Sequence, residues 1–286
     1  MQFYGDRPLV KRAQPWLGTL VSIGVTGLAQ SRAQEAIGAA FAEVATVDRH
    51  MSFHKEMSDV SRLNREAVHG PVTVHPYTFE VLRWALWISA ASGGCFDISV
   101  GSQLVEWGLL PPPSSPRSEL RSTWRDIELH EDGWVRFHQP LWIDLGGIAK
   151  GYAVDRAIDC LCRWEVEQAV VNAGGDLRVQ GPHAGADWFA TGNSKRRDAP
   201  ARAKGRQLGQ QQWPSESLSG PGPALWPARA GNGGYPAPTD RFVCVVAEQC
   251  IVADALTKVV MAEGAQSRDV LRHFGASAHW HDPGAG

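Results

Sequence analysis

The most informative stretch of this sequence is IDLGGIAKGYAVDRAIDCL, which runs from Ile143 to Leu161. Its first residues end an apolar segment, and the adjacent glycines Gly146 and Gly147 predict a tight turn. After the turn, apolar residues recur at i, i+3, i+4 and i+7, the spacing of one face of an α-helix (Val154, Ala157, Ile158, Leu161). The stretch therefore predicts a strand, a glycine turn and a helix in succession.

The glycine turn is the best candidate for a binding site. Adjacent glycines let backbone N–H groups converge on an anion where a helix begins, and Lys150 adds a positive charge at the same place. An ordinary turn followed by a surface lysine is the simpler explanation of such a pattern taken alone, and Asp144 by itself would cap a helix as often as bind a ligand. Whether the glycine turn is a binding site must therefore be judged from other motifs in the chain.

Other segments predict strands and helices on both sides of this stretch. β-Branched apolar runs predict strands, apolar residues at helical spacing predict helices, and an Asp-Gly pair at 132–133 predicts a hairpin. The predicted elements are a strand at 16–25, helices at 32–47 and 76–92, a hairpin at 126–143, a strand at 169–179, and a strand and helix within 242–262. This mixture indicates an α+β fold.

Composition excludes several classes of function. The chain has 286 residues, 43% of them hydrophobic, and a net charge of -2, so no broad cationic field draws it to nucleic acid or anionic lipid. No apolar run predicts membrane insertion or a signal peptide, which favours the cytoplasm, or the periplasm if the true start lies elsewhere. Five cysteines without a CxxC pair argue against a zinc site and a complete disulfide framework.

Residues 191–239 form an atypical segment rich in glycine, proline and arginine. Between 191 and 240 there are seven prolines and eight glycines, but only Leu208, Leu218 and Leu225 among Val, Ile, Leu and Met. Such a stretch cannot build a core, so it is predicted to be disordered. It is either a degenerate insertion or the product of a compensated frameshift in a GC-rich gene.

Two further motifs hold residues that could carry chemistry. GGCFDISVG places Asp97 after a glycine pair, although a turn and an ordinary strand residue explain it as well. In ADALT, Asp254 and Thr257 share one helix face, but an N-terminal cap accounts for both. Neither motif identifies a functional site by itself, so these residues indicate a site only when the motifs are considered together.

Six motifs in this order resemble the ApbE family of flavin transferases. The resemblance covers most of residues 16–189 and 241–265. The matching segments are Leu17-Gly18-Thr19, MSFHKEMSDVSRLN (51–64), GCFDISVG with VEWG (94–108), DLGGIAKGYAVD (144–155), NAGGD (172–176) and ADALTK (253–258).

The resemblance implies one ApbE-like domain over residues 1–286, with FAD bound between two lobes. The implied activity is Mg²⁺-dependent transfer of the FMN moiety of FAD to a threonine or serine of an acceptor protein in a redox chain, releasing AMP. The implied metal ligands are the carbonyl of Gly147 and the side chains of Asp254 and Thr257, oxygen donors that suit a hard cation. The implied FAD contacts are His54, Cys95, Phe96, Asp97, Asp144 and Lys150.

The chain also departs from the family pattern. His54 replaces a flavin-stacking tyrosine, Leu17 replaces a methionine, and Lys258 stands where the family has a threonine ligand. The family's TSG and HHIxDPxTG motifs are not recognisable, so no catalytic residue is assigned. Two alternatives therefore stay open: an FAD-binding protein without transferase activity, and a metal-dependent FAD pyrophosphatase.

Overall fold

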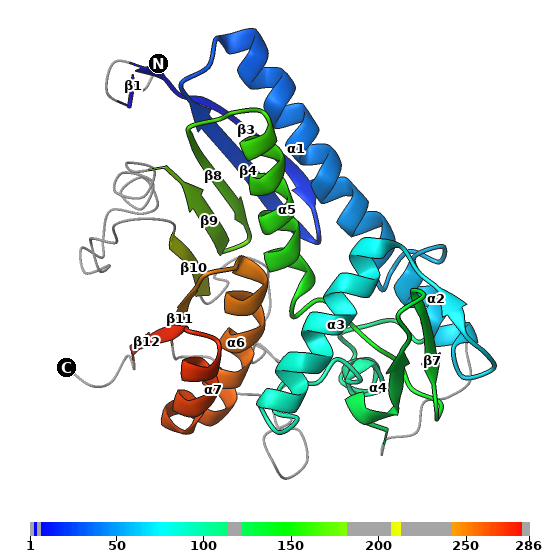
Figure 1. The fold of residues 1–286 in the computed structure, drawn as a ribbon. Helices are drawn as coiled ribbons and strands as arrows, with labels where there is room; N and C mark the ends of the chain where they lie inside the picture. The colour runs from blue at the N-terminus through cyan, green and yellow to red at the C-terminus, as the bar shows by residue number, and fades with distance from the viewer. Residues whose placement is uncertain (1–2, 5–6, 114–121, 182–206, 213–241, 282–286) are drawn as a thin grey trace.

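A seven-stranded antiparallel sheet is the largest of the three sheets that the structure describes (Figure 1). The structure is a computed structural model that describes residues 3–4, 7–113, 122–181, 207–212 and 242–281. In the sheet the strands follow the order β12-β11-β10-β9-β8-β4-β3. They are β3 (Val10–Trp16), β4 (Thr19–Thr26), β8 (Gln168–Ala173), β9 (Asp176–Gln180), β10 (Gln207–Gln212), β11 (Phe242–Ala247) and β12 (Ser277–His281). A separate short pair joins β1 (Phe3–Tyr4) and β2 (Arg7–Pro8).

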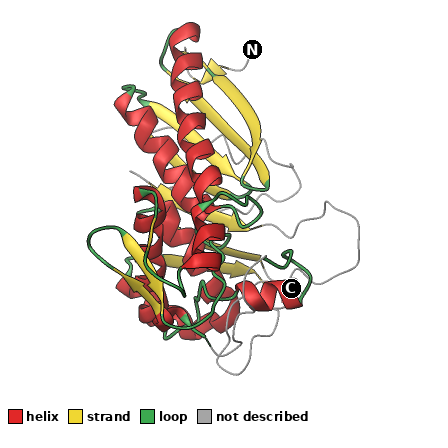
Figure 2. Cartoon of the chain, turned by 90° about the vertical axis from the view of Figure 1, so that its right-hand side faces the viewer, coloured by secondary structure: helices red, strands yellow, loops and turns green. Residues whose placement is uncertain are grey.

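Long helices cover one face of this sheet (Figure 2). They are α1 (Gln30–Met51), α5 (Ala149–Arg163) and α6 (Cys250–Glu263), followed by the short α7 (Arg268–His273). Each long helix turns an apolar stripe to the sheet, and the inward side chains of β4, Val21, Ile23 and Val25, are at most 1% exposed. No helix among the described residues is both long and apolar enough to cross a membrane.

A smaller unit packs beside the lower ends of α1 and α5 (Figure 1). It contains a three-stranded sheet in the order β5-β7-β6, formed by β5 (Val72–Thr73), β6 (Ile127–Leu129) and β7 (Trp134–Phe137). Its helices are α2 (Asp59–Glu66), α3 (Pro76–Ala91) and α4 (Gly101–Glu106). Buried apolar residues of this unit and of the large sheet form one continuous cluster.

The α+β class and the strongly periodic helices are as predicted. The differences concern strands. The strand predicted to end at Ile143 stops at Phe137, the end of β7, and residues 138–145 lead into the glycine turn without strand structure. The stretch 169–179 is not one strand but the hairpin β8–β9, because Gly174 and Gly175 adopt positive φ angles of 62° and 107°. Strand β3 was absent from the prediction, because polar and charged residues and Pro15 interrupt its apolar pattern.

Composition predicts that residues 191–239 are disordered. Six residues of this segment contradict that prediction. Residues 207–212 form β10, which pairs with β9 on one side and β11 on the other. Backbone hydrogen bonds to two neighbours form a strand here even though the segment is poor in aliphatic residues. The other residues of 191–239 lie outside the described residues.

Candidate functional site

The glycine loop before α5 is fixed by one buried amide. Asn64 on α2 accepts a hydrogen bond from Ile143 N at 2.8 Å and donates to Ile143 O at 3.0 Å. The next backbone N–H, of Asp144, donates to Ile98 O at 2.9 Å. Gly146 N then donates to Asp144 Oδ2 at 3.0 Å, which closes the turn. The final Asn of the MSFHKEMSDVSRLN motif therefore holds the segment that leads into the DLGG loop.

A cavity of about 190 Å³ opens beside this loop. Its apolar lining comes from residues 96–104 and from the turn after α4, and two carboxylates and one ammonium group also line it. Ligand pockets for drug-sized molecules have volumes of about 300–1,000 Å³, so this cavity accommodates only one part of a dinucleotide. The lining residues are Phe96, Asp97, Ile98, Val100, Leu104, Leu109, Leu110, Asp144, Gly146, Gly147 and Lys258.

Asp97 organises the GCFDISVG segment, which lies beside the glycine loop because Asp144 N donates to Ile98 O. Its Oδ1 accepts hydrogen bonds from Ser99 N at 2.8 Å and Ser99 Oγ at 2.7 Å. Its Oδ2 accepts from Trp124 N at 3.4 Å. These contacts hold the GCFDISVG segment in place, so the aspartate positions Phe96 as well as lining the cavity.

Four charged residues form a buried network behind the loop. Lys258 Nζ donates to Asp254 O at 2.9 Å and forms an ion pair with Asp254 Oδ1, while Lys150 Nζ pairs with Asp176 and lies 3.9 Å from Asp254 Oδ1. Burial lowers the pKa of Lys150, but the two carboxylates outweigh it and the net pKa is raised. Burial and the neighbouring Asp254 raise the pKa of Asp176, against the opposing effect of the lysines. Among the described residues, two ammonium groups thus face two carboxylates in this network.

The start of α5 is bound tightly to the start of α6. Gly151 N donates to Asp254 Oδ2 at 2.9 Å. One turn later, the carboxylate of Asp155 accepts from Cys250 N at 3.0 Å and Ile251 N at 2.9 Å, and it also binds Arg178 at 2.7 Å. Asp155 therefore caps α6 from a neighbouring helix, a role that the sequence motif did not indicate.

The arrangement does not fit a Mg²⁺ site formed by Gly147, Asp254 and Thr257. Lys258 engages one carboxylate oxygen of Asp254 and a backbone N–H of α5 engages the other. Thr257 Oγ1 donates to a main-chain oxygen one turn earlier, at 2.8 Å. Mg²⁺ requires several oxygen ligands in octahedral geometry, and an adjacent ammonium repels it. Across the described residues, no three His, Cys, Asp or Glu side chains are grouped so that they could hold a metal ion.

The predicted FAD contacts fall into two groups. Phe96, Asp97 and Asp144 line the cavity, whereas His54, Cys95 and Lys150 do not. His54 is exposed. Burial raises the pKa of Asp144, against smaller opposing effects of the Gly146 N–H and of the nearby His54. Cys95 is buried, which raises its pKa to about 12.

The two lysines near the loop differ in how they face the cavity. Lys150 was predicted beside the ligand at the surface of the loop, but its ammonium turns inward to Asp176. Lys258, which sequence reasoning treated as a departure from a motif, is the lysine that lines the cavity. Its place at i+4 from Asp254 was the available signal, because residues four apart on a helix lie on the same face.

Comparison with known proteins identifies the family. Residues 17–199, more than half of the chain, match the ApbE family. The chain belongs to the ApbE family. A crystal structure of an ApbE protein from Thermotoga maritima superposes with a TM-score of 0.72 at 25% identity, over 95% of this chain and 93% of that one. The flavinyl transferase ApbE of Pseudomonas stutzeri gives a TM-score of 0.75 at 20% identity, over 98% and 94%, and supports the fold alone.

Curated relatives of this ApbE chain carry the name FAD:protein FMN transferase. One from Vibrio cholerae is 29% identical over 152 residues, which are 50% of this chain and 46% of the relative. One from Treponema pallidum is 27% identical over 188 residues, or 59% and 51%. The chain thus spans about half the length of the curated relatives it matches. The family and the α+β fold predicted from the sequence are confirmed.

Proposed function

We propose that the chain binds FAD beside the glycine loop and transfers its FMN moiety to a threonine or serine hydroxyl of an acceptor protein. The observation that carries the proposal is the cavity at the DLGGIAKGYAVD motif, in a chain of the ApbE family. The loop contributes the acceptor Asp144 and two glycines whose small size lets a ligand approach the backbone. The names of the curated relatives supply the substrate class.

The residues of the cavity suit different parts of FAD. Phe96 lines the cavity and packs against the glycine turn, since a Cβ added to Gly147 would lie 3.5 Å from its Cε2 atom, so its ring suits an aromatic part of the ligand. Asp144, half-buried and held by one N–H of the loop, can accept a hydrogen bond from a hydroxyl or ring N–H of the ligand. Lys258 offers positive charge to phosphate. The remainder of FAD lies outside the cavity, because the cavity is too small for the whole molecule.

The proposed reaction is an in-line displacement at phosphorus. The acceptor hydroxyl oxygen attacks the FMN phosphorus, the bond to the bridging oxygen of AMP breaks, and AMP leaves with the bonding electrons. The hydroxyl proton passes to a base, to which we assign no residue. The chain's own contribution is to orient the diphosphate and to balance its charge, which accounts for most catalysis in this class of reaction.

A transfer assay tests the proposal. The purified chain is incubated with FAD and an acceptor subunit carrying a small-residue Thr/Ser motif, in Mg²⁺ and in chelator, beside an acceptor whose target threonine is alanine. Covalent flavin on the denatured wild-type acceptor, with an equal amount of free AMP, supports transfer. Free FMN and AMP without labelled acceptor would indicate hydrolysis by water instead, and would contradict the proposal.

One observation favours a second candidate function, FAD binding without transfer. Lys258 pairs with Asp254, the carboxylate that the resemblance assigns to the metal. If the reaction requires that metal, this pair prevents its binding and the chain retains only the nucleotide site. The same assay distinguishes the candidates: bound FAD with neither labelled acceptor nor AMP supports the second one.

A further inference from the structure

Lys258 is a cation that lines the cavity. Among the described residues, the charged side chains of the lining are Asp97, Asp144 and Lys258. The first two carboxylates accept hydrogen bonds from the walls, from Ser99 and from Gly146 respectively. The ammonium of Lys258 therefore supplies the positive charge available to an anionic ligand on this lining.

The position of this ammonium is set from two sides. The side chain is only 2% exposed, and it is held by the carboxylate and the main-chain oxygen of Asp254 one turn earlier. Asp254 is in turn held by Gly151 N. On the loop side, a Cβ on Gly147 would lie 3.7 Å from Lys258 Cε, so the lysine stem packs against the glycine turn. A buried lysine held this rigidly loses little entropy when it meets a ligand.

The surrounding charges leave no role for an additional divalent ion. Lys150 and Lys258 already balance Asp176 and Asp254. A divalent ion beside Asp254 would bring two more positive charges into contact with two ammonium groups and would have to displace one of them. Without the ion, the ammonium of Lys258 is already held next to the loop, where it can donate a hydrogen bond to an anion.

We infer that Lys258 takes the place of a divalent cation, so that this site binds the diphosphate of FAD without metal. The inference rests on the proposed function, because it assumes that FAD binds at this loop. It makes Lys258 the residue that determines metal dependence. A threonine there would free the Asp254 carboxylate for a metal ion, and a lysine excludes the ion and substitutes for its charge.

Binding of FAD to the full chain, measured by quenching of flavin fluorescence in EDTA and in Mg²⁺, tests the inference. For the unaltered chain we expect the same Kd in both conditions, within about twofold. For Lys258→Thr we expect a Kd about 10- to 100-fold higher in EDTA, the loss typical of a charge-assisted contact, and recovery of most of the affinity in Mg²⁺. Recovery by Mg²⁺ would also show that this variant folds.

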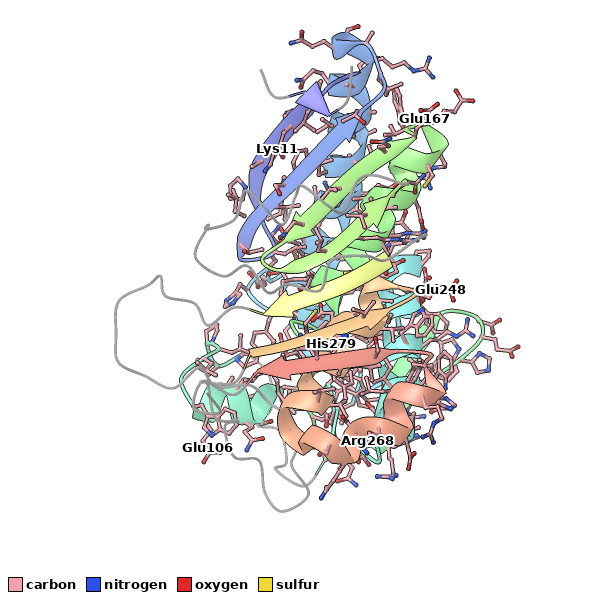
Figure 3. All side chains as sticks on the ribbon, turned by 90° about the vertical axis from the view of Figure 1, so that its left-hand side faces the viewer. Lys11, Glu106, Glu167, Glu248, Arg268 and His279 are labelled. Atoms are coloured by element: carbon pink, nitrogen blue, oxygen red, sulfur yellow. The ribbon has the colours of Figure 1, made fainter. Side chains whose placement is uncertain are left out.

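Lys258→Thr leaves the buried carboxylate of Asp254 without the ammonium that pairs with it, which could unfold the chain. A second variant keeps the test valid in that case. The double change Asp254→Asn with Lys258→Met removes both charges together, and it should bind FAD weakly in EDTA and in Mg²⁺ alike. Thermal unfolding confirms that it is folded. Lys11→Met is the matched control, since Lys11 lies on β3 at the far end of the large sheet, and it should bind FAD as the unaltered chain does (Figure 3).

Three results would overturn the inference. If the unaltered chain binds FAD only in Mg²⁺, Lys258 does not replace the ion, although the proposed function stands. If Lys258→Thr binds FAD in EDTA as tightly as the unaltered chain, the ammonium does not contact the ligand. If neither the unaltered chain nor any variant binds FAD in either condition, the proposed function is wrong, and the inference that rests on it is wrong as well.

Discussion

The carboxylate of Asp155 joins three elements, because it accepts two N–H groups of α6 and pairs with Arg178 of β9. For Asp155→Asn we expect a loss of about 1.5–3 kcal/mol in the free energy of unfolding, since hydrogen bonds to a buried charge are the stronger ones. Urea denaturation measures it. Asp269→Asn is the control: its side chain is 89% exposed, and the change should stay within about 0.5 kcal/mol. Equal effects of the two changes would contradict the capping role.

Asp144 is the residue for which a simple test of FAD contact is possible. It is half-buried, lines the cavity and is not part of the four-residue charge network. Asp144→Asn should therefore raise the Kd for FAD roughly tenfold while leaving the melting temperature nearly unchanged. Flavin fluorescence and a thermal melt on the same sample give both values. An unaltered Kd would remove Asp144 from the site.

Asp176 gives a pH dependence of stability. Burial raises its pKa from 3.8 to about 6 in the folded protein. Between these values the folded state holds more protons than the unfolded chain, so this group's contribution to stability falls as the pH rises from about 4 to 6. In urea denaturation at several pH values, the unaltered chain should lose stability over this window relative to Asp176→Asn. A constant difference between the two proteins would show that the raised pKa is absent.

Residue identities predicted the position of the site better than the role of each side chain. Phe96, Asp97 and Asp144 were predicted and line the cavity. Lys150 was predicted to contact FAD and Lys258 was treated as a departure from the family pattern, because the sequence does not give the direction of either side chain. Lys150 meets Asp176 of β9, 26 residues away, whereas Lys258 meets Asp254 four residues earlier on the same helix.

The contact between α5 and α6 depends on Gly151. A Cβ at this position would lie 2.4 Å from Cys250 O and 2.8 Å from Asp254 Cβ, so an alanine would force the helices apart. Gly151→Ala should destabilise the protein by about 1–3 kcal/mol, the usual cost of overpacking, and should also weaken FAD binding. Denaturation and fluorescence titration check both effects.

Gly38, within α1, offers a matched control. A Cβ there would meet only Arg12 Nη1 at 4.0 Å. Gly38→Ala should therefore stabilise the chain by about 0.5–1 kcal/mol, because alanine favours a helix more than glycine does. Destabilisation of similar size at both glycines would mean that helix contact is not the cause.

Elements with long periodic patterns were predictable, and short ones were not. The apolar stripes of α1, α3 and α5 repeat over several turns, whereas α2, α4 and α7 have eight residues or fewer. The hairpin β8–β9 was predicted as one strand because its apolar residues continue across the turn. Only the paired glycines within it marked the reversal.

At the scale of the whole molecule, the continuity of the large sheet depends on β10. This strand alone connects β9 to β11 in the strand order. Replacing residues 191–239 by a short Gly-Ser linker removes it and leaves both neighbours with unpaired edges, which favour aggregation. We expect the deletion variant to be aggregated or unfolded in size-exclusion chromatography and circular dichroism. A monomer with an unaltered melting temperature would show that the sheet closes without β10.

The pairing of β4 with β8 bears on how the chain is made. Thr26 of β4 and Gln168 of β8 are hydrogen-bonded across 142 residues of sequence. At synthesis rates of 5 to 20 residues per second, β4 and its apolar side chains wait roughly 7 to 30 s on the ribosome before their second neighbour is made. During this time Val21, Ile23 and Val25 can be shielded only by elements made before β8, of which the β3–β4 hairpin and α1 come first. The nascent chain therefore carries an open apolar strand edge through much of translation, the kind of surface that chaperones bind.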